Sequence, residues 1–574
     1  MRVRDAYQPG LVVRGCDYLI CAGIGTLIVC TPLAFGTVRL WAISLMEALV
    51  FFLALVWMSK LVILEWQRAR RDHPASETIV HGVRKILLPL WLFVVFGGVQ
   101  LVPLPPGLLS YLSPATHELY TRSLPGWPEQ IPYVEWLASE EASNGADSAG
   151  QARDSARGET PLPISVAPSM TYATLLTFLA YATLFSLILC YPIANSEGRD
   201  QGGRILSFLL ITIVISGFLV ATIGIVQRYW WNGKILWVLV PSDWDGPRPD
   251  IIPRASGPFV NSDHFANYLA LIWPLALCGV WKAEAFVVQR WVRCWRLFCV
   301  AALLTIGVGV LLSVSRGGWL GVIGGSAVCW YMLSHHHSSH VQKPQRLRSV
   351  PRWLVPVGGV LAFFLVLAMI GSEARRQITL RIERTVGQQS GLHDRVAVWQ
   401  DSLRMVTDFP VVGVGLGAWS ELFPRYQRPP WNSVPWREAH NDYVQCLTEA
   451  GIIGTVLLGW FFVSVGVHLL RGLRTRSTIR TPAVIGVTAA LGVMSFHAGF
   501  DFVLQIPANA LLFTILLAIG LRFAKRATEE EARLQVPYVR MPLVAAGGFV
   551  SALLCVLAFS QPPYAGIRDI NEIR

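Results

Sequence analysis

Charged side chains are scarce in this sequence. Only 15% of its 574 residues are Asp, Glu, Lys or Arg, 53% are hydrophobic, and the mean hydropathy is +0.47. Soluble domains carry about 25% charged residues. A deficit of this size, spread along the whole chain, excludes an ordinary soluble protein and indicates many membrane-spanning segments.

Cysteine pairs and metal-binding carboxylate pairs are also lacking. The ten cysteines lie mostly inside or beside apolar runs, and no CxxC motif occurs. This pattern argues against a disulfide framework or a cysteine metal site. No paired-carboxylate or DxD-like motif is convincing, so we expect no catalytic metal and no cofactor.

Long apolar runs are abundant. A helical span needs about 20 apolar residues, and isolated strands cannot satisfy their backbone groups in lipid. We therefore predict an all-α polytopic membrane protein with about 12–13 transmembrane helices and a large, partly helical periplasmic loop. The expected spans cover about residues 17–36, 40–59, 86–104, 171–194, 205–227, 264–281, 297–314, 317–334, 353–371, 451–470, 482–500, 507–521 and 541–560.

The distribution of lysine and arginine predicts the orientation of these spans. More than half of these residues fall at the N-terminus and in alternate connections, whereas the short connections of the opposite set hold only Arg39 and Arg316. Cytoplasmic loops carry the excess of positive charge, so the N-terminus is expected inside and the first apolar run is expected to be retained. The net charge of +12 then reflects membrane topology, and no nucleic-acid partner is expected.

Three long polar segments lie outside in this topology: residues 105–170, 228–263 and 372–450. The first contains a Ser-, Ala-, Gly- and Glu-rich stretch, Glu140 to Thr160, that indicates a flexible loop. The third contains Val396, Trp399, Leu403 and Val406 at helical spacing. Phe409-Pro410 and the glycines after it are expected to end that helix.

Polar residues that membrane insertion does not require gather in four outer patches. Two border apolar runs of the middle of the chain, and two lie within the large third segment, the second of them where it re-enters the membrane. They are Arg254 to Asn267, which includes Asn261; Ser313 to Trp319, which includes Ser315 and Arg316; His393 to Trp399, which includes Arg395; and His440 to Gln445, which includes Asn441, Asp442 and Tyr443.

Arg316 is the most informative of these residues. It lies in a hairpin of only a few residues, at the face that the charge pattern leaves nearly bare. An arginine that snorkels to the interface is one interpretation. A fixed cation that faces an anionic ligand is the other, because guanidinium binds phosphate oxygens in a bidentate manner and keeps its charge.

The third outer segment contains arginine but no lysine, which suits phosphate or phospholipid headgroups. Its first four arginines, from Arg375 to Arg384, are expected to rest on lipid headgroups, and Arg395 is the candidate for ligand binding. The complete set is Arg375, Arg376, Arg381, Arg384, Arg395, Arg404, Arg425, Arg428 and Arg437.

His440 is a candidate general base. It is expected near the N-terminus of a helix, where the helix dipole disfavours the imidazolium, and a neutral imidazole can accept a proton. A capping or interfacial histidine is the alternative, and it is the interpretation that we favour for His264 and His497.

Two weaker signals concern the same outer segment. Gly413-Val-Gly-Leu-Gly417 is not a dinucleotide fingerprint and is expected to let the backbone turn tightly. Trp399, Trp419 and Trp431 are candidates for stacking on sugar rings, whereas most other tryptophans are expected at the membrane interface.

At these patches the chain resembles the O-antigen ligase family, which shares a domain with O-antigen polymerases. The matching pieces lie within about residues 205–522. They are RASGPFVNSDHFANYLAL, SVSRGGWLG, HDRVAVWQDSLRMVTDFPVVGVGLGAW, AHNDYVQCLTEAGIIG and FHAGFDFVLQIPANALLF.

The resemblance implies a GT-C-like, metal-independent inner-membrane glycosyltransferase. Such an enzyme moves a glycan from undecaprenyl diphosphate to an acceptor, lipid A-core or a similar glycolipid or glycan, at the periplasmic face. Its two arginines and its histidine correspond to Arg316, Arg395 and His440. Substrate-binding roles would fall to Arg254, Asn261, Ser315, Trp399, Asn441, Asp442 and Tyr443.

Three domains follow from this assignment. Residues 1–200 would hold N-terminal spans and the flexible loop, residues 201–525 the ligase-like catalytic membrane domain, and residues 526–574 a cytoplasmic linker and a last span. An O-antigen or exopolysaccharide polymerase, a protein O-oligosaccharyltransferase and a polysaccharide transporter remain alternatives.

Overall fold

The regular structure of this protein is helical. The computed structural model describes residues 11–69, 81–124, 126–128, 160–191, 201–241, 244–250, 253–335, 392–429, 435–474 and 481–525, with isolated positions in 376–383 and 550–554. Over these residues the only β pairings are two isolated bridges, Leu104 with Leu162 and Ile235 with Leu239. The predicted all-α class is therefore confirmed.

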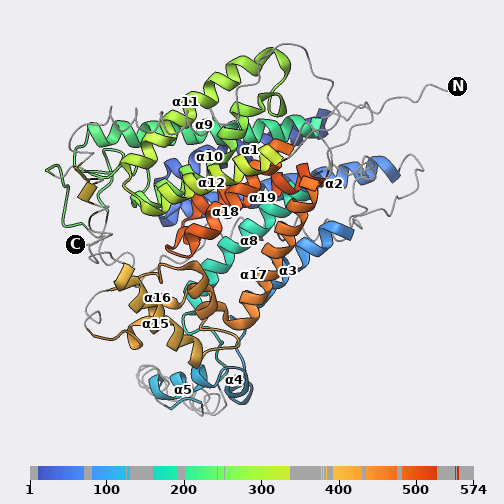
Figure 1. The fold of residues 1–574 in the computed structure, drawn as a ribbon. Helices are drawn as coiled ribbons and strands as arrows, with labels where there is room; N and C mark the ends of the chain where they lie inside the picture. Colours follow the sequence, from blue (N-terminus) through green and yellow to red (C-terminus); the bar gives the residue numbers. More distant parts are fainter. Residues whose placement is uncertain are drawn as a thin grey trace, which may run out of the picture. The chain divides into compact units, whose positions relative to one another are not determined.

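Nine described helices are long and apolar enough to cross a membrane (Figure 1). They are α1 (Leu11–Leu33), α2 (Leu40–Ala69), α8 (Pro168–Cys190), α9 (Gln201–Tyr229), α10 (Ser262–Trp281), α11 (Val292–Leu312), α17 (Asp442–Arg474), α18 (Thr481–Ala498) and α19 (Pro507–Lys525). Their number confirms a polytopic membrane protein.

The other expected spans have different outcomes. Helices α3 (His81–Val99) and α12 (Arg316–His335) coincide with two of them but are not among the nine. The expected span at 353–371 lies outside the described residues, and so does almost all of the span at 541–560.

Shorter helices connect the long ones. They are η1 (Phe35–Thr37), α4 (Pro106–Leu112), α5 (Pro114–Ser123), η2 (Ala283–Ala285), η3 (Gln289–Trp291), α15 (Leu392–Asp408), α16 (Trp419–Leu422), η4 (Phe423–Arg425) and η6 (Val503–Gln505).

The chain forms two compact units, each discontinuous in the sequence. Unit 1 comprises residues 1–81, 183–391 and 465–574, and unit 2 comprises residues 82–182 and 392–464. The three domains predicted from the sequence, with boundaries at residues 200 and 525, stay a prediction.

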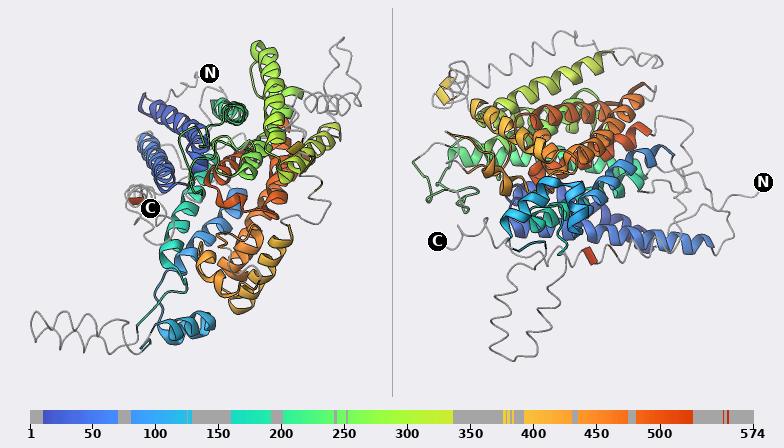
Figure 2. Two further views of the ribbon diagram at one scale, coloured as in Figure 1. Left: turned by 90° about the vertical axis from the view of Figure 1, so that its left-hand side faces the viewer. Right: turned by 90° about the horizontal axis from the view of Figure 1, so that it is seen from below.

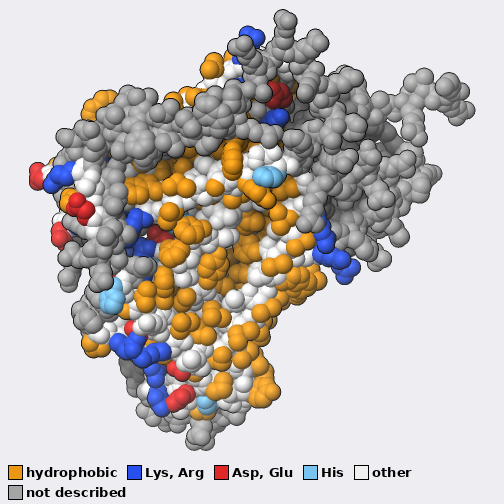
Figure 3. Space-filling model, in the orientation of Figure 1, with side chains coloured by type: hydrophobic (Ala, Val, Ile, Leu, Met, Phe, Trp, Pro, Cys, Tyr) orange, Lys and Arg blue, Asp and Glu red, His pale blue; other side chains and the backbone are white. Residues whose placement is uncertain are grey.

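Helix α10 forms the centre of unit 1, where it contacts α9, α11, α12, α18 and α19. Large apolar side chains on the surrounding helices point outward, among them Leu297 of α11 and Ile323 of α12. Figure 3 shows many such hydrophobic side chains on the surface of the described helices. Exposed apolar side chains of this kind are expected where helices contact lipid.

Unit 2 contains the folded part of the third polar segment. Helix α15 ends at Asp408, immediately before Phe409-Pro410, as predicted. The helix predicted from the spacing is confirmed, but Leu403 is 46% exposed, and the core beside this helix includes Val398, Met405 and Phe409 instead. Figure 2 shows the 392–429 segment, in gold, beside the first turns of α17.

Both ends of the 105–170 segment are also folded within unit 2. The Tyr120 hydroxyl of α5 donates hydrogen bonds to the carbonyls of Pro163 (3.1 Å) and Ser165 (2.8 Å). Burial raises the pKa of Tyr120 to about 12, so the phenol stays a neutral donor. The predicted flexible stretch, Glu140 to Thr160, lies outside the described residues except for Thr160.

A break in α17 joins this helix to the glycine motif. Gly451 has non-helical backbone angles within α17 (φ 59°, ψ −165°). The backbone N–H groups of Ile452 and Val414 bridge the break, donating to Pro410 O at 2.8 Å and to Thr448 O at 3.0 Å respectively. The 410–415 segment therefore satisfies the backbone groups that the break leaves without helical partners.

Gly413 is required where these two backbones meet. Its φ is +71°, and a Cβ at this position would lie 2.3 Å from Glu449 O. Only glycine combines a left-handed backbone with such a close approach. The interpretation of the motif as a tight backbone turn is thus confirmed.

Gly413→Ala should destabilise unit 2 strongly. The left-handed conformation alone costs a residue with a side chain roughly 1–2 kcal/mol, before the overlap with Glu449 is counted. Thermal unfolding of the detergent-solubilised protein measures this loss. Gly459→Ala in α17 is the control, because open space surrounds Gly459, and it should leave the melting temperature unchanged or slightly raised. Equal effects of the two substitutions would contradict this account.

Candidate active site

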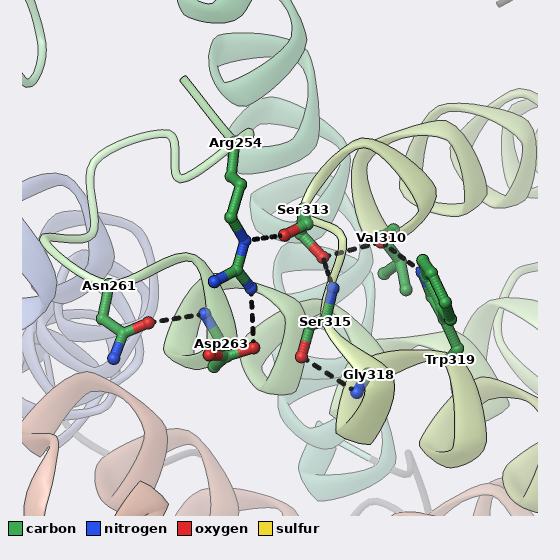
Figure 4. A network of polar contacts seen from close by, with 8 residues as sticks. All are labelled: Arg254, Asn261, Asp263, Val310, Ser313, Ser315, Gly318 and Trp319. Atoms are coloured by element: carbon green, nitrogen blue, oxygen red, sulfur yellow. Dashed lines mark hydrogen bonds and ion pairs between the residues drawn. The ribbon is translucent and has the colours of Figure 1, made fainter. Parts of the chain in front are cut away.

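In unit 1, Arg254 fixes the turn that carries Arg316 (Figure 4). The Arg254 guanidinium donates through Nε to Ser313 O at 2.6 Å and through Nη2 to Asp263 Oδ1 at 2.8 Å. The next residue, Ala255, donates its backbone N–H to Leu312 O at 2.9 Å. The loop before α10 is thereby bound to the end of α11.

The turn between α11 and α12 holds a residue in an unfavourable backbone conformation. Val314 has φ 52°, which is an outlier for a β-branched residue. On one side of it, the Ser313 hydroxyl donates to Val310 O (2.7 Å) and accepts the N–H of Ser315 (3.2 Å). Strained residues of this kind persist where the surrounding contacts determine them, and they concentrate at functional sites.

Ser315 caps α12 and so makes Arg316 the first residue of that helix. The fully buried Ser315 hydroxyl accepts the N–H of Gly318 at 3.2 Å. A cation is disfavoured by the dipole at a helix N-terminus, whereas an anion is favoured there. The half-buried Arg316 is therefore placed where a bound anion would be stabilised by both the guanidinium and the helix.

The substrate-binding residues predicted in unit 1 all have partners within the fold. Arg254 and Ser315 hold the turn, and Asn261 caps α10 by accepting the N–H of Asp263 at 2.8 Å. These contacts give each of the three a structural role. Their role in binding a substrate stays a prediction.

In unit 2, Trp399 joins α15 to the residue before His440. Its indole Nε1 donates to Ala439 O at 3.0 Å. Arg395 lies one helical turn before Trp399, on the same side of α15. The structure thus brings the turn of α15 that carries Arg395 to the segment that carries His440.

His440 is held in a left-handed backbone conformation with φ 52°. Its ring meets the Trp436 ring edge-on, with 5.6 Å between the centroids. Asn441 caps α17 by accepting the N–H groups of Tyr443 (3.0 Å) and Val444 (3.1 Å). His440 therefore directly precedes the cap of a helix, as the sequence predicted.

The remaining predicted residues of unit 2 differ in their access to a ligand. Asp442 is buried, whereas the Tyr443 side chain is 54% exposed. Trp419 is fully buried, stacks on Phe423 and donates to Ser402 Oγ at 3.1 Å. The prediction that Trp419 stacks on sugar is therefore wrong, and Trp431 lies outside the described residues.

The segment before His440 is held by Gln445 and Glu449, to which the sequence assigned no role. Gln445 accepts the N–H of Ala439 at 3.1 Å and donates to Glu438 (2.6 Å) and to Glu449 (3.1 Å). Glu449 in turn accepts the N–H of Gly417 at 2.9 Å. The spacing of Gln445 and Glu449, four residues apart in one helix, was the available signal.

One arginine of the third segment is neutralised within unit 2. Arg428 forms an ion pair of 2.5 Å with Asp401, whose side chain is almost fully buried. Close by in the sequence, Tyr426 donates to Asp408, and burial together with that carboxylate raises the pKa of Tyr426. An arginine-only composition therefore does not by itself identify phosphate ligands.

The proposed residues are divided between the units. Arg316 belongs to unit 1, and Arg395 and His440 belong to unit 2. Across the described residues, no group of three or more His, Cys, Asp or Glu side chains is arranged to hold a metal ion.

Arg254→Gln should lower the melting temperature if Arg254 holds the turn. The loss should correspond to about 1.5–3 kcal/mol, typical of a hydrogen bond to a charged group. Arg254→Gln leaves the partly buried Asp263 carboxylate without its cation. Adding Asp263→Asn removes that charge and should recover part of the loss. Arg293→Gln, at an exposed position of α11, is the control. An unchanged melting temperature for Arg254→Gln would leave ligand binding as its role.

One family comparison bears on these residues. Residues 300–459 match the model of the O-antigen ligase family. The match includes Ser315, Arg316, Arg395 and the 440–443 segment, whereas Arg254 and Asn261 precede it. A search of curated proteins gives no match. Residues 300–459 are therefore similar to a domain of the O-antigen ligase family, and this similarity supports a glycosyltransferase activity of the ligase and polymerase type in general.

Proposed function

We propose that this protein transfers a glycan from undecaprenyl diphosphate to an acceptor, lipid A-core or a related glycolipid or glycan, at the periplasmic face of the bacterial inner membrane. The N-terminus is cytoplasmic in this proposal. The reaction uses neither metal nor cofactor and inverts the anomeric configuration. The family match supports the general activity, and the charge pattern of the connections supports the orientation.

Arg316 and Arg395 bind the diphosphate of the donor. Guanidinium groups suit this role because they stay charged and bind phosphate oxygens in pairs. The position of Arg316 as the first residue of α12 supports the assignment, since the helix N-terminus adds to the attraction for an anion. Both cations would stabilise the negative charge that grows on the leaving group.

His440 acts as the general base. A neutral imidazole takes the proton from the acceptor hydroxyl, and the hydroxyl oxygen attacks the anomeric carbon from the face opposite the diphosphate. The new carbon–oxygen bond forms as the bond from the anomeric carbon to the phosphate oxygen breaks. The electron pair of that bond leaves with undecaprenyl diphosphate.

One observation carries this proposal. The Trp399 indole binds the carbonyl of Ala439, so that one contact holds α15, which carries Arg395, beside the residue that precedes His440. His440 itself is fixed between that contact and the Asn441 cap. A base that is held by its neighbours on both sides loses little motional freedom when the substrate arrives.

Replacing each proposed catalytic residue should lower the transfer rate by about 10²–10³, as expected when one charge-stabilising group is lost. The variants are Arg316→Gln, Arg395→Gln and His440→Asn. Asparagine is preferred at position 440 because it tolerates the left-handed backbone. Product formation by protein reconstituted in liposomes with the lipid-linked donor measures the rate.

Two exposed residues of α15, the helix that carries Arg395, provide the controls. Arg404→Gln and His393→Asn change exposed residues of α15 and should transfer glycan at the wild-type rate. The amount of protein in the membrane must be equal for all five variants. Wild-type rates for the three site variants would refute the assignment.

The identity of the acceptor should appear in the product. With lipid A-core offered beside the lipid-linked glycan and a protein acceptor, mass analysis should find glycan on lipid A-core. Longer lipid-linked chains would instead identify a polymerase, and glycosylated protein an oligosaccharyltransferase. Movement of the donor across the bilayer with no new glycosidic bond would identify a transporter.

A further inference from the structure

His497 of α18 lies against the turn that carries Arg316. A Cβ at Gly317 would lie 2.4 Å from His497 Nε2, closer than any real contact. The imidazole therefore occupies the space beside the second residue of α12. Gly317 directly follows Arg316, so this contact limits where the first turn of α12 can lie.

A buried hydrogen-bond chain holds the imidazole in place. Asn267 Nδ2 lies 2.9 Å from His497 Nδ1, and Asn267 Oδ1 accepts from Asn509 Nδ2 at 3.2 Å. Because the Asn267 amide nitrogen can only donate, Nδ1 of His497 accepts, and the ring proton of the neutral imidazole is on Nε2. The ring is thus oriented by its Nδ1 atom, with Nε2 directed at Gly317.

The hydrogen-bond chain and the contact with Gly317 together connect four helices of unit 1. Asn267 belongs to α10, His497 to α18 and Asn509 to α19, and Gly317 belongs to α12. All three polar side chains are almost completely buried. Polar groups at such positions are costly unless they are bonded to one another, so the bonds among these side chains favour one arrangement.

We propose that His497 is a positioning residue for Arg316. It acts on the reaction through Gly317, by fixing the first turn of α12 and hence the direction of the Arg316 side chain, and it does not touch the substrate. This inference rests on the proposed function of Arg316. It also changes the interpretation of His497, which the sequence suggested to be a histidine without a role in the reaction.

Two substitutions separate the two ends of the imidazole. Gln places its terminal amide near the position of Nε2, so His497→Gln keeps the contact with Gly317 and loses the bond to Asn267. Asn places its oxygen near the position of Nδ1, so His497→Asn keeps the bond and loses the contact. Thermal unfolding of both variants measures the loss of stability. If His497 positions Arg316, these losses need not follow the order of the transfer rates.

The rates of glycan transfer by the reconstituted full-length protein then test the inference. His497→Asn should lower kcat about 10–100-fold, the effect expected from a displaced catalytic group, with the KM for the acceptor unchanged. His497→Gln should stay within about threefold of the wild-type rate on the same argument. Equal kcat values for the two variants would overturn the inference.

A double-mutant cycle tests the contact itself. Gly317→Ala should lower kcat strongly in the wild-type background, because the added methyl group meets the fixed imidazole. In the His497→Ala background there is room for that methyl group, so the same substitution should cost much less. An equal cost in both backgrounds would show that the two residues act independently.

Arg316→Gln in the same assay separates failure of this inference from failure of the proposed function. If Arg316→Gln abolishes transfer while His497→Asn transfers at the wild-type rate, only the inference is wrong. If Arg316→Gln itself transfers at the wild-type rate, the proposed function is wrong and the inference fails with it.

Discussion

Inside a bilayer, each backbone N–H and C=O group must find its partner within the protein. Both candidate constellations of this protein arise where a helix begins and its first N–H groups lack helical partners. Ser315 provides the cap for α12, and Asn441 provides it for α17. Arg316 directly follows the first cap and His440 directly precedes the second. Arg316 and His440 are thus placed by the same contacts that allow these two helices to begin.

The turns around the candidate residues also have unusual backbone conformations. Val314 and His440 both have left-handed backbones, which a residue with a side chain adopts only when its neighbours require it. Beside Val314 the neighbours are the Arg254 guanidinium and the Ser313 hydroxyl. Groups that are fixed before the substrate binds need no rearrangement as charge develops, and this is how such sites stabilise a transition state.

The sequence predicted which helices exist better than it predicted their buried faces and their packing partners. The helix at residues 392–408 and its end before Phe409-Pro410 follow from local spacing and from proline, and the structure contains both. The buried side of that helix did not follow, because an apolar stripe through Leu403 competes with one through Met405 and only packing decides between them. Trp419 was misjudged for the same reason, since its burial depends on Phe423 and Ser402.

The sequence by itself determined that the chain is helical, crosses a membrane many times and resembles one enzyme family in several short motifs, because hydrophobic length, charge asymmetry and short motifs are local properties. Only the tertiary structure decided which arginines are compensated within the protein. Arg254 pairs with Asp263 of α10 and Arg428 with Asp401 of α15, and in each case the arginine lies outside the helix that carries its partner. It also decided that His497 meets Gly317, a contact between residues 180 positions apart that no local pattern encodes.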